Sequence, residues 1–324
     1  MLRWIYERHS FWGLPCYACG GSDGWHTLFC GWRSNSYIAV ACCRKCGAEQ
    51  FLKRYRRPVS DDGTCLAQWE YDVLCHLSRA GYAPSFLLPT VFRFAAATCA
   101  LSMQYLRGET MDERMRRAVD RRDLDDCLRV SAMWLRGLHA TPPLRDKTGN
   151  GPATMLLRLE SDCGLLAGRN AVAARALLYM RSCLHRVSSL PVELVPLHGD
   201  FKASNLIWTE DGIYGVDIGM RFKNAGVMDA AQFIADVLLN RCSMKAIASE
   251  YDTAAVLGVF LEAYDDNSKH KWQITAWWLL YFLLSRWEED RDGWKPSIIV
   301  DRAYVSAVAE VMAFCGRNGF AEAA

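Results

Sequence analysis

A short polar segment in the second half of the chain constrains the fold more strongly than any other feature. Residues 198–208 read HGDFKASNLIW, and the chain then reaches DIG at residues 217–219. Apolar runs at 194–197 and 213–216 flank these motifs, which predicts short strands on both sides of a polar loop. The pattern H-G-D-x4-N followed by D-x-G therefore places two aspartates and one asparagine on loops that strands hold in position.

This pattern resembles the aminoglycoside phosphotransferase and choline kinase group, which shares the protein-kinase-like fold. In that group HGD stands where protein kinases have HRD, and DxG or DxD replaces DFG. The resemblance implies an ATP-dependent kinase in which Asp200 accepts the proton of a substrate hydroxyl, while Asn205 and Asp217 hold Mg²⁺. It also implies that His198 braces the loop. The alternative, a chance HGD turn before an unrelated aspartate, does not explain the spacing and the flanking strands together.

The chemistry of phosphoryl transfer explains why these residue types are needed. The reaction requires an acceptor oxygen in line with the γ-phosphate and cations that neutralise the developing charge. Carboxylate and amide oxygens are hard ligands that suit Mg²⁺. A further aspartate, Asp229, lies in GVMDAA at 226–231, where the family often has a proline that this chain lacks. We expect Asp229 to cap a helix or to tie down the catalytic loop.

The first half of the chain carries candidates for binding the nucleotide phosphates. Residues 49–55 read EQFLKRY, a predicted strand that resembles the family's L-K-R-Y ending. Apolar residues at helical spacing predict a helix over 66–79, which carries Glu70. The resemblance implies that Lys53 contacts the α- and β-phosphates and that Glu70 holds its ammonium group. Asp72 is a nearby alternative to Glu70, and an ordinary edge-strand lysine is the alternative for Lys53.

Two further segments of the first half are assigned from the resemblance. Residues 31–37 read GWRSNSY, where the family commonly has a G-G-x-x-N turn above the phosphates, so Asn35 is assigned to this loop. With the single glycine Gly31, the loop departs from the family pattern. Residues 101–110 resemble the hinge between lobes, whose backbone groups bind the adenine edge, with Met103 to Leu106 as the candidates. A plain core strand is the alternative for this segment.

Four of the 14 cysteines form two C-x2-C-G motifs, at 16–20 and 43–47, that do not belong to the family pattern. Each resembles a zinc knuckle, because the glycine after the second cysteine frees backbone N–H groups to approach the sulfurs. Two knuckles make a tetrahedral site for a structural Zn²⁺. The expected ligands are Cys16, Cys19, Cys43 and Cys46. A redox dithiol and incidental buried cysteines are the alternatives, and Cys42 or Cys30 are nearby substitutes in the second pair.

Together these assignments predict an α+β, protein-kinase-like fold with two lobes. We expect a β-rich lobe with the cysteine motifs and the nucleotide-binding sheet at residues 1–106, and a helical lobe with the acceptor site at 107–324.

The net charge of +2 gives no support for extensive electrostatic binding of nucleic acid. The most apolar run, 272–284, is too short for a membrane span. The charged start of the chain is unlike a signal peptide, so we expect a cytoplasmic protein.

The identity of the acceptor and the oligomeric state stay open at the level of sequence. Acidic and aromatic residues at 287–294, with Trp272, Trp277 and Trp278, would suit a cationic acceptor. A solvated, charged helix end with buried aromatic residues is the alternative for this region. The arginines at 114–117 and 121–122 would suit a phosphorylated or acidic sugar, or would face water.

Three functions follow from these features. The first is a kinase of a small-molecule alcohol, of aminoglycoside, amino-alcohol or sugar type. The second is a protein or glycolipid kinase of the same fold, and the third is a catalytically silent nucleotide-binding scaffold. The intact set of Lys53, Asp200, Asn205 and Asp217 argues against the scaffold, while the glycine-poor loop argues for it.

Overall fold

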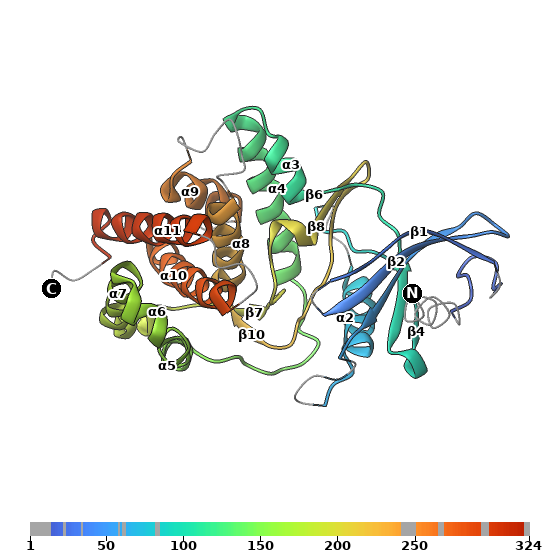
Figure 1. Cartoon of the computed structure of the whole chain (residues 1–324), viewed down its shortest axis with the longest axis horizontal. Coiled ribbons are helices and arrows are strands. Elements are labelled where there is room, and N and C mark those ends of the chain that lie inside the picture. Colours follow the sequence, from blue (N-terminus) through green and yellow to red (C-terminus); the bar gives the residue numbers. More distant parts are fainter. Residues whose placement is uncertain are drawn as a thin grey trace. The chain divides into compact units, whose positions relative to one another are not determined.

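The computed structural model describes residues 14–21, 24–33, 35–57, 59, 63–81, 85–240, 251–264, 269–292 and 298–320. Backbone contacts divide the chain into two compact units. The sheet unit comprises residues 1–108 and 209–219, and the helical unit comprises residues 109–208 and 220–324. Figure 1 labels most of the helices and strands of both units.

The sheet unit is built on one antiparallel sheet, which has five strands among the described residues, in the order β1-β2-β3-β5-β4. The strands are β1 (Trp25–Trp32), β2 (Ser36–Cys43), β3 (Glu49–Tyr55), β4 (Val91–Ala95) and β5 (Ala100–Gln104). Helix α2 (Leu66–Ala80) follows β3, and the 3-10 turn η1 (Ala96–Thr98) follows β4. The strand predicted at 49–55 and the helix predicted at 66–79 are thereby confirmed.

Different parts of the chain cover the two faces of this sheet. Side chains alternate between the faces along a strand, and Phe51 of β3 packs against Leu74 of α2. On the other face, Leu52 belongs to a cluster with Leu14 and Cys16, which precede β1. The cysteine-bearing segment therefore covers the face opposite to α2.

The segment 209–219 belongs to the sheet unit although it lies far along the chain. Strand β8 (Leu206–Thr209) ends at Thr209, the first residue of this segment, and β9 (Gly212–Gly215) follows. The N–H of Leu87 donates to the carbonyl of Ile213 (3.3 Å), and the N–H of Gly215 donates to the carbonyl of Leu87 (3.1 Å). These bonds hold the chain in the sheet unit just before Asp217.

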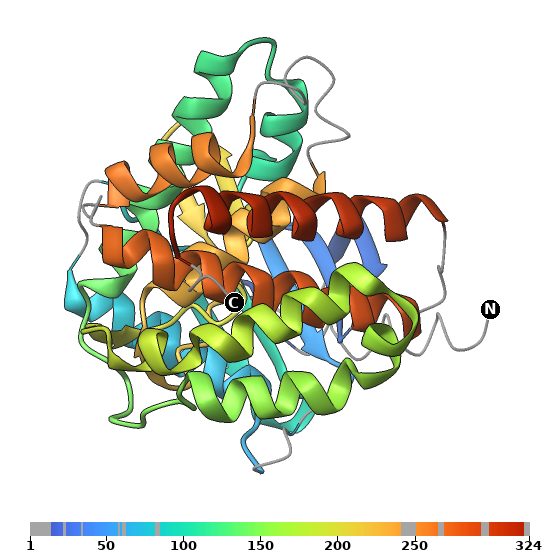
Figure 2. The ribbon, with the colours of Figure 1, turned by 90° about the vertical axis from the view of Figure 1, so that its left-hand side faces the viewer.

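The helical unit consists mainly of helices joined by short strand pairs. The helices are α3 (Met111–Arg117), α4 (Arg121–His139), α5 (Pro152–Asp162), α6 (Gly164–Arg169), α7 (Ala171–Ser189), α8 (Val227–Asn240), α9 (Thr253–Tyr264), α10 (Lys269–Asp292) and α11 (Ile298–Arg317). Strand β6 (Glu109–Thr110) pairs with β8, strand β7 (Leu194–Pro196) pairs with β10 (Lys223–Ala225), and η2 (Ala203–Asn205) is a 3-10 turn. Helix α10 packs against α8 and α11, and α4 packs against α9 (Figure 2).

Helix α10 is enclosed by its neighbours, as expected of a helix that is apolar on many sides. Its residues Trp277, Trp278 and Trp287 are each 1% exposed, and Nε1 of Trp277 donates to the carbonyl of Met180 (3.0 Å). These tryptophans are therefore core residues rather than walls of an acceptor site, while Trp294 lies outside the described residues. Among the described helices, none combines the length and the apolar character needed to span a membrane.

Candidate active site

In the sheet unit, Lys53 lies at the centre of a buried cluster of charges. Its Nζ lies 2.9 Å from Oε2 of Glu70 on α2 and also contacts Oδ1 of Asp217. The side chains of Lys53 and Glu70 are only 7% and 6% exposed. Asp72, the alternative partner, instead accepts a hydrogen bond from Gln68. The structure thus brings together three of the residues assigned to the nucleotide site.

Tyr55, the last residue of the L-K-R-Y run, belongs to the same cluster and was missed by sequence reasoning. Its hydroxyl donates to Oε2 of Glu70 (2.6 Å), and Nζ of Lys53 lies 4.8 Å from the centre of its ring. The available signal was the two-residue spacing, which puts Lys53 and Tyr55 on one face of β3. Burial and the Glu70 carboxylate raise the pKa of Tyr55, so its hydroxyl stays a donor.

The charges of the cluster keep Lys53 protonated. Burial alone would lower the pKa of Lys53, but the carboxylates of Glu70 and Asp217 outweigh it and hold the pKa well above its ordinary value. Burial also raises the pKa of Glu70, a shift that the adjacent ammonium opposes. Lys53 is therefore a fixed, protonated group in a buried setting, and an ammonium suits recognition of phosphate.

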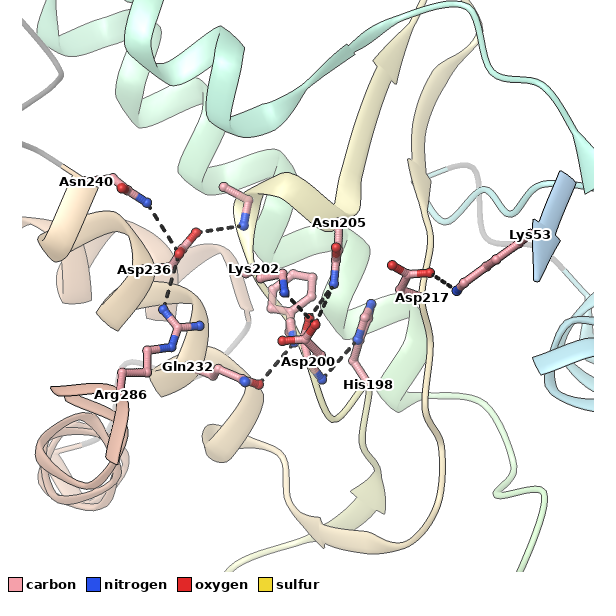
Figure 3. A network of polar contacts seen from close by, with 12 residues as sticks. Lys53, His198, Asp200, Lys202, Asn205, Asp217, Gln232, Asp236, Asn240 and Arg286 are labelled. Atoms are coloured by element: carbon pink, nitrogen blue, oxygen red, sulfur yellow. Dashed lines mark hydrogen bonds and ion pairs between the residues drawn. The ribbon is translucent and has the colours of Figure 1, made fainter. Parts of the chain in front are cut away.

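Asp217 lies on a backbone turn that few residue types adopt. Its φ is +61°, in the left-handed region that Asp and Asn tolerate better than other residues with a side chain. Nε1 of Trp69 on α2 donates to the carbonyl of Gly219 and so anchors the D-x-G motif. The side chain of Asp217 points to Lys53 (Figure 3) yet remains 48% exposed. Strained backbone of this kind is common at functional sites.

In the helical unit, donors on the loop of residues 198–205 converge on Asp200. Nζ of Lys202 lies 2.6 Å from Oδ2 of Asp200, and Nδ2 of Asn205 lies 3.2 Å from the same oxygen (Figure 3). Asn205 also donates to the backbone carbonyl of Asp200 (2.8 Å), and Nδ1 of His198 accepts from the N–H of Asp200 (3.3 Å). His198 thus braces the loop as expected, whereas Lys202 is a charged neighbour that sequence reasoning missed.

Asp229 ties down the loop that carries Asp200, as expected. It is 1% exposed, and its two oxygens accept hydrogen bonds from the N–H groups of His198 (2.6 Å) and Gly199 (3.1 Å). Nε2 of His139 on α4 lies 3.0 Å from the same carboxylate. These partners replace the water that burial removes from a charged group.

Gln232 and Asp236 extend this support along α8. Oε1 of Gln232 accepts from the N–H of Phe201 (3.1 Å), and Oδ2 of Asp236 accepts from the N–H of Ala203 (3.2 Å). Figure 3 shows both side chains reaching from α8 to the loop. Positions 229, 232 and 236 share one helix face. Sequence reasoning missed both residues, although this spacing after Asp229 is a signal that could have found them.

A cavity of about 570 Å³ lies beside Asp200 within the helical unit. Its charged lining residues are Asp200, Lys202, Asp229, Asp236, Arg286, Glu289 and Asp290, and its aromatic ones include Tyr281, Phe282 and Tyr304. Arg286 of α10 lies 3.2 Å from Oδ1 of Asp236 (Figure 3). Two acids of the run considered for a cationic acceptor therefore line the cavity, whereas the arginines at 114–117 and 121–122 do not.

Asn35 lies in the turn between β1 and β2. Its carbonyl accepts from the N–H of Arg56 (2.8 Å), and the guanidinium of Arg56 lies 5.5 Å from the ring centre of Trp32. Trp32 stands where the family pattern has its second glycine, and Ser34 lies outside the described residues. The turn is therefore lined by an aromatic and a basic side chain.

The segment 103–106, called the hinge segment below, follows from the end of β5. Met103 is 4% exposed and pairs with Phe51 of β3, so its side chain belongs to the core beside α2. Leu106 is half-buried beyond the end of the strand. Met103 can therefore offer a ligand only its backbone groups.

The four cysteines of the two knuckles converge on one point. Their Sγ atoms all lie within 4.8 Å of one another, with 3.6 Å between Cys16 and Cys46 and 3.7 Å between Cys19 and Cys43. Corners of a tetrahedron with metal–sulfur bonds of ~2.3 Å are about 3.8 Å apart. Cys42 is outside the cluster, and its Sγ donates to the carbonyl of Gly47. The set fits a soft, four-coordinate metal ion.

The two knuckles repeat one backbone pattern. The N–H of Gly20 donates to the carbonyl of Cys16 (2.9 Å), and that of Gly47 donates to the carbonyl of Cys43 (2.8 Å). Both glycines have left-handed φ values, 69° and 73°, which a residue without Cβ adopts at little cost. The backbone N–H of Cys46 lowers the pKa of Cys43 to about 7. The N–H of Ala48 lowers the pKa of Cys46, but burial and the neighbouring thiols outweigh it and raise this pKa to about 12, so Cys43 ionises before Cys46.

Comparisons with solved structures identify the fold. A choline/ethanolamine kinase family protein from Mesorhizobium loti is 14% identical, with a TM-score of 0.65 over 98% of this chain and 96% of that one. Choline kinase LicA from Streptococcus pneumoniae is 16% identical, with a TM-score of 0.60 over 96% and 99%. The streptomycin–ATP–APH(2")-IIa ternary complex is 13% identical, with a TM-score of 0.55 over 97% and 96%. The expected kinase-like fold is thereby confirmed.

Comparison at the level of sequence gives the family. No curated protein matches the chain by sequence. A model of the phosphotransferase enzyme family matches residues 44–238, which include Lys53, Glu70, Asp200, Asn205 and Asp217. The match begins inside the second knuckle, so it includes Cys46 but not Cys16, Cys19 or Cys43. Because the matched segment is more than half of the chain, this protein belongs to the phosphotransferase enzyme family, and the expectation of a phosphotransferase is confirmed.

Proposed function

We propose that the protein transfers the γ-phosphate of ATP to a hydroxyl group of a small molecule, with Asp200 as the catalytic base. The observation that carries this proposal is the cavity beside Asp200. A carboxylate that is 45% exposed, and that is held by donors on its own loop, faces a space of about 570 Å³. Such a space suits a small acceptor rather than a folded protein.

Asp200 would act through its position. Asn205 and Lys202 fix its carboxylate at Oδ2, and the support from α8 fixes the loop that carries it. The carboxylate would orient the acceptor hydroxyl and take its proton as the oxygen attacks phosphorus. The Lys202 ammonium, 2.6 Å away, would supply positive charge beside the reacting groups.

The nucleotide would be held mainly by the sheet unit. Lys53, kept protonated by Glu70 and Asp217, is assigned to the α- and β-phosphates, with Asn35 on the loop near them. Backbone groups of the hinge segment, from Met103 to Leu106, are assigned to the adenine edge. This arrangement separates the recognition of phosphate from the recognition of the base.

The residues assigned to Mg²⁺ fit that ion chemically. Asp217 offers a half-exposed carboxylate on its left-handed turn, and Asn205 offers an amide oxygen, both of them hard ligands. Bound with ATP, Mg²⁺ would neutralise the charge that develops on the phosphates. The carboxylate of Asp217 also holds Lys53, so one side chain would link the ion to the phosphate-binding lysine.

For the acceptor, we propose a cationic alcohol of the amino-alcohol or aminoglycoside type. Five acids line the cavity against the two bases Lys202 and Arg286, and the latter already pairs with Asp236. Glu289 and Asp290, near the end of α10, are exposed and stand beside aromatic rings. An ammonium group is attracted both by carboxylates and by ring faces.

The four clustered cysteines complete the proposal as a structural zinc site. A closed set of four thiolates leaves no open position for chemistry. Elemental analysis is expected to give one zinc per chain, and metal removal is expected to lower the melting temperature. A thiolate site of this kind suits a reducing compartment such as the cytoplasm. A folded protein without metal and with an unchanged melting temperature would contradict the zinc site.

The experiment that tests the function is ATP turnover against a panel of acceptors. The panel contains aminoglycosides, amino-alcohols, neutral sugars and proteins. We expect turnover with a cationic alcohol, its loss in Asp200→Asn, and a raised KM for that acceptor in the double variant Glu289→Gln/Asp290→Asn. Turnover only with proteins would favour the second function, and no turnover with any acceptor would favour the scaffold.

A further inference from the structure

The second knuckle lies at one particular end of the five-stranded sheet. Cys43 is the last residue of β2 and Glu49 is the first residue of β3, so the knuckle is the turn between these strands. Gln50 of β3 pairs with Gln104, the last residue of β5. The knuckle therefore borders the place where the chain leaves β5 in the hinge segment.

The first knuckle contacts the strand on the other side of β5. The ring of Tyr17, between Cys16 and Cys19, stacks on Phe92 of β4 with the ring centres 3.8 Å apart and the planes at 9°. Thr90, just before β4, is bonded twice to Gln104. Its carbonyl accepts from the N–H of Gln104 (2.8 Å), and its N–H donates to Oε1 of Gln104 (3.2 Å).

The two knuckles therefore contact both strands that flank β5, because β5 lies between β3 and β4 in the sheet. One ion bound by all four thiolates would join these strands at the exit of β5. Glu49 adds a further tie after the second knuckle. Its carboxylate accepts two hydrogen bonds from the guanidinium of Arg107, at 2.6 and 3.1 Å, and Arg107 directly follows the hinge segment.

The phosphate-binding cluster is held by other contacts. Lys53 pairs with Leu101, three positions further from the knuckle along both strands than the pair of Gln50 and Gln104. Its partners are Glu70 on α2 and Asp217 of the D-x-G motif. A change at the knuckles should therefore move the hinge segment while Lys53 stays in place.

We propose that the metal ion held by Cys16, Cys19, Cys43 and Cys46 positions the hinge segment, so that metal occupancy controls the binding of adenine but not of triphosphate. This inference rests on the proposed function, in which the hinge segment binds the adenine edge. The ion acts through the two flanking strands and not by touching the nucleotide, because thiolates fill its four positions.

The test compares two probes, ATP and inorganic tripolyphosphate, titrated calorimetrically with Mg²⁺ into the full chain. The zinc-loaded protein is compared with Cys19→Ser and with the matched control Cys75→Ser, which changes a free thiol on α2 outside the cluster. Loss of one well-aligned hydrogen bond to adenine corresponds to about a 2–10-fold change in Kd. We expect Cys19→Ser to lose zinc and to raise the Kd for ATP by that factor. The Kd for tripolyphosphate should stay within about twofold of its value in the zinc-loaded protein. Cys75→Ser should behave as the unchanged protein.

Tyr17 gives a second test that keeps all four thiols, in case Cys19→Ser does not fold. Tyr17→Ala removes the stack on Phe92, and we expect it to retain zinc, to bind ATP about threefold more weakly and to bind tripolyphosphate unchanged. Tyr17→Phe keeps the ring and should restore the affinity for ATP.

Three results would overturn the inference. One is an unchanged ATP affinity in folded, zinc-free Cys19→Ser. Another is equal weakening of ATP and tripolyphosphate, which would mean a general loosening of the sheet unit. The third is a zinc-loaded protein that binds neither probe, and this result alone would also overturn the proposed function.

Discussion

The two units hold their reactive groups by different means. In the sheet unit, Lys53 is held by opposite charges in a buried setting. In the helical unit, Asp200 is carried by a loop whose backbone N–H groups are bound by side chains of α8. A buried charge depends on its compensating partner, whereas a hydrogen-bonded loop depends on geometry. Changes in the first should therefore affect folding and activity together, and changes in the second should affect activity first.

The largest effect on activity without a loss of stability is expected from Asp200→Asn. The substitution keeps the size of the side chain but removes the proposed base, and general-base catalysis contributes about 10²–10⁴-fold. We expect kcat to fall by that factor while the affinity for ATP, measured by calorimetry, stays within twofold. A parallel fall in the melting temperature would show that Asp200 is structural and would remove the contrast between the units.

The sheet unit is probed by Lys53→Met, which leaves the Glu70 carboxylate buried without its cation. Breaking a buried pair in this way costs about 3–5 kcal/mol of unfolding free energy, and ATP binding should be lost as well. The double variant Lys53→Met/Glu70→Gln should regain most of the stability in denaturant unfolding, but no activity. If the single variant is as stable as the unchanged protein, charge compensation does not hold this cluster.

A smaller effect is expected from Asp229→Asn. Hydrogen bonds to a buried charged acceptor contribute about 1.5–3 kcal/mol, and Asn cannot accept from both backbone N–H groups and His139 at once. We expect kcat to fall about 10–100-fold with a modest loss of stability. The KM for ATP should hardly change, since Lys53 is untouched. A change confined to that KM would contradict the assigned role.

The smallest effect is expected from Gln232→Ala, which removes one neutral hydrogen bond to the N–H of Phe201. Such a bond contributes about 0.5–1.5 kcal/mol, so kcat should fall at most about tenfold. Gln232→Glu keeps the acceptor oxygen and should restore most of the rate. Full activity in Gln232→Ala would show that the bond from Gln232 is not needed, and that Asp229 is the main residue of α8 that holds the loop.

The parts of the site that could be predicted are those written in short, local patterns. Lys53 on a strand and Glu70 on the next helix, and Asp200 with Asn205 on one loop, each lie within a few residues of a recognisable motif. The cysteine pairs could also be identified from the sequence, since each knuckle is complete within five residues. In all these cases the chemistry constrains the nearby sequence directly.

The parts that could not be predicted depend on contacts between distant residues. Gln232 and Asp236 bind backbone groups 31 and 33 positions away. Almost every residue has a backbone N–H, so the residue type does not show which N–H a distant side chain will bind. The tryptophans of α10 could not be assigned for a different reason. A tryptophan in the sequence is equally compatible with a buried core and with the wall of a ligand site. Only packing places Trp277 in the interior while Glu289 lines the cavity.

The left-handed turn at Asp217 limits which substitutions can test the role of the Asp217 carboxylate. Most random substitutions there would combine the loss of the carboxylate with a backbone penalty, so their poor survival in a mutant library would not reveal a role in binding. Asn tolerates this φ about as well as Asp. Asp217→Asn is therefore the variant from which the contribution of the charge can be read by itself, and Ala at the same position would overstate it.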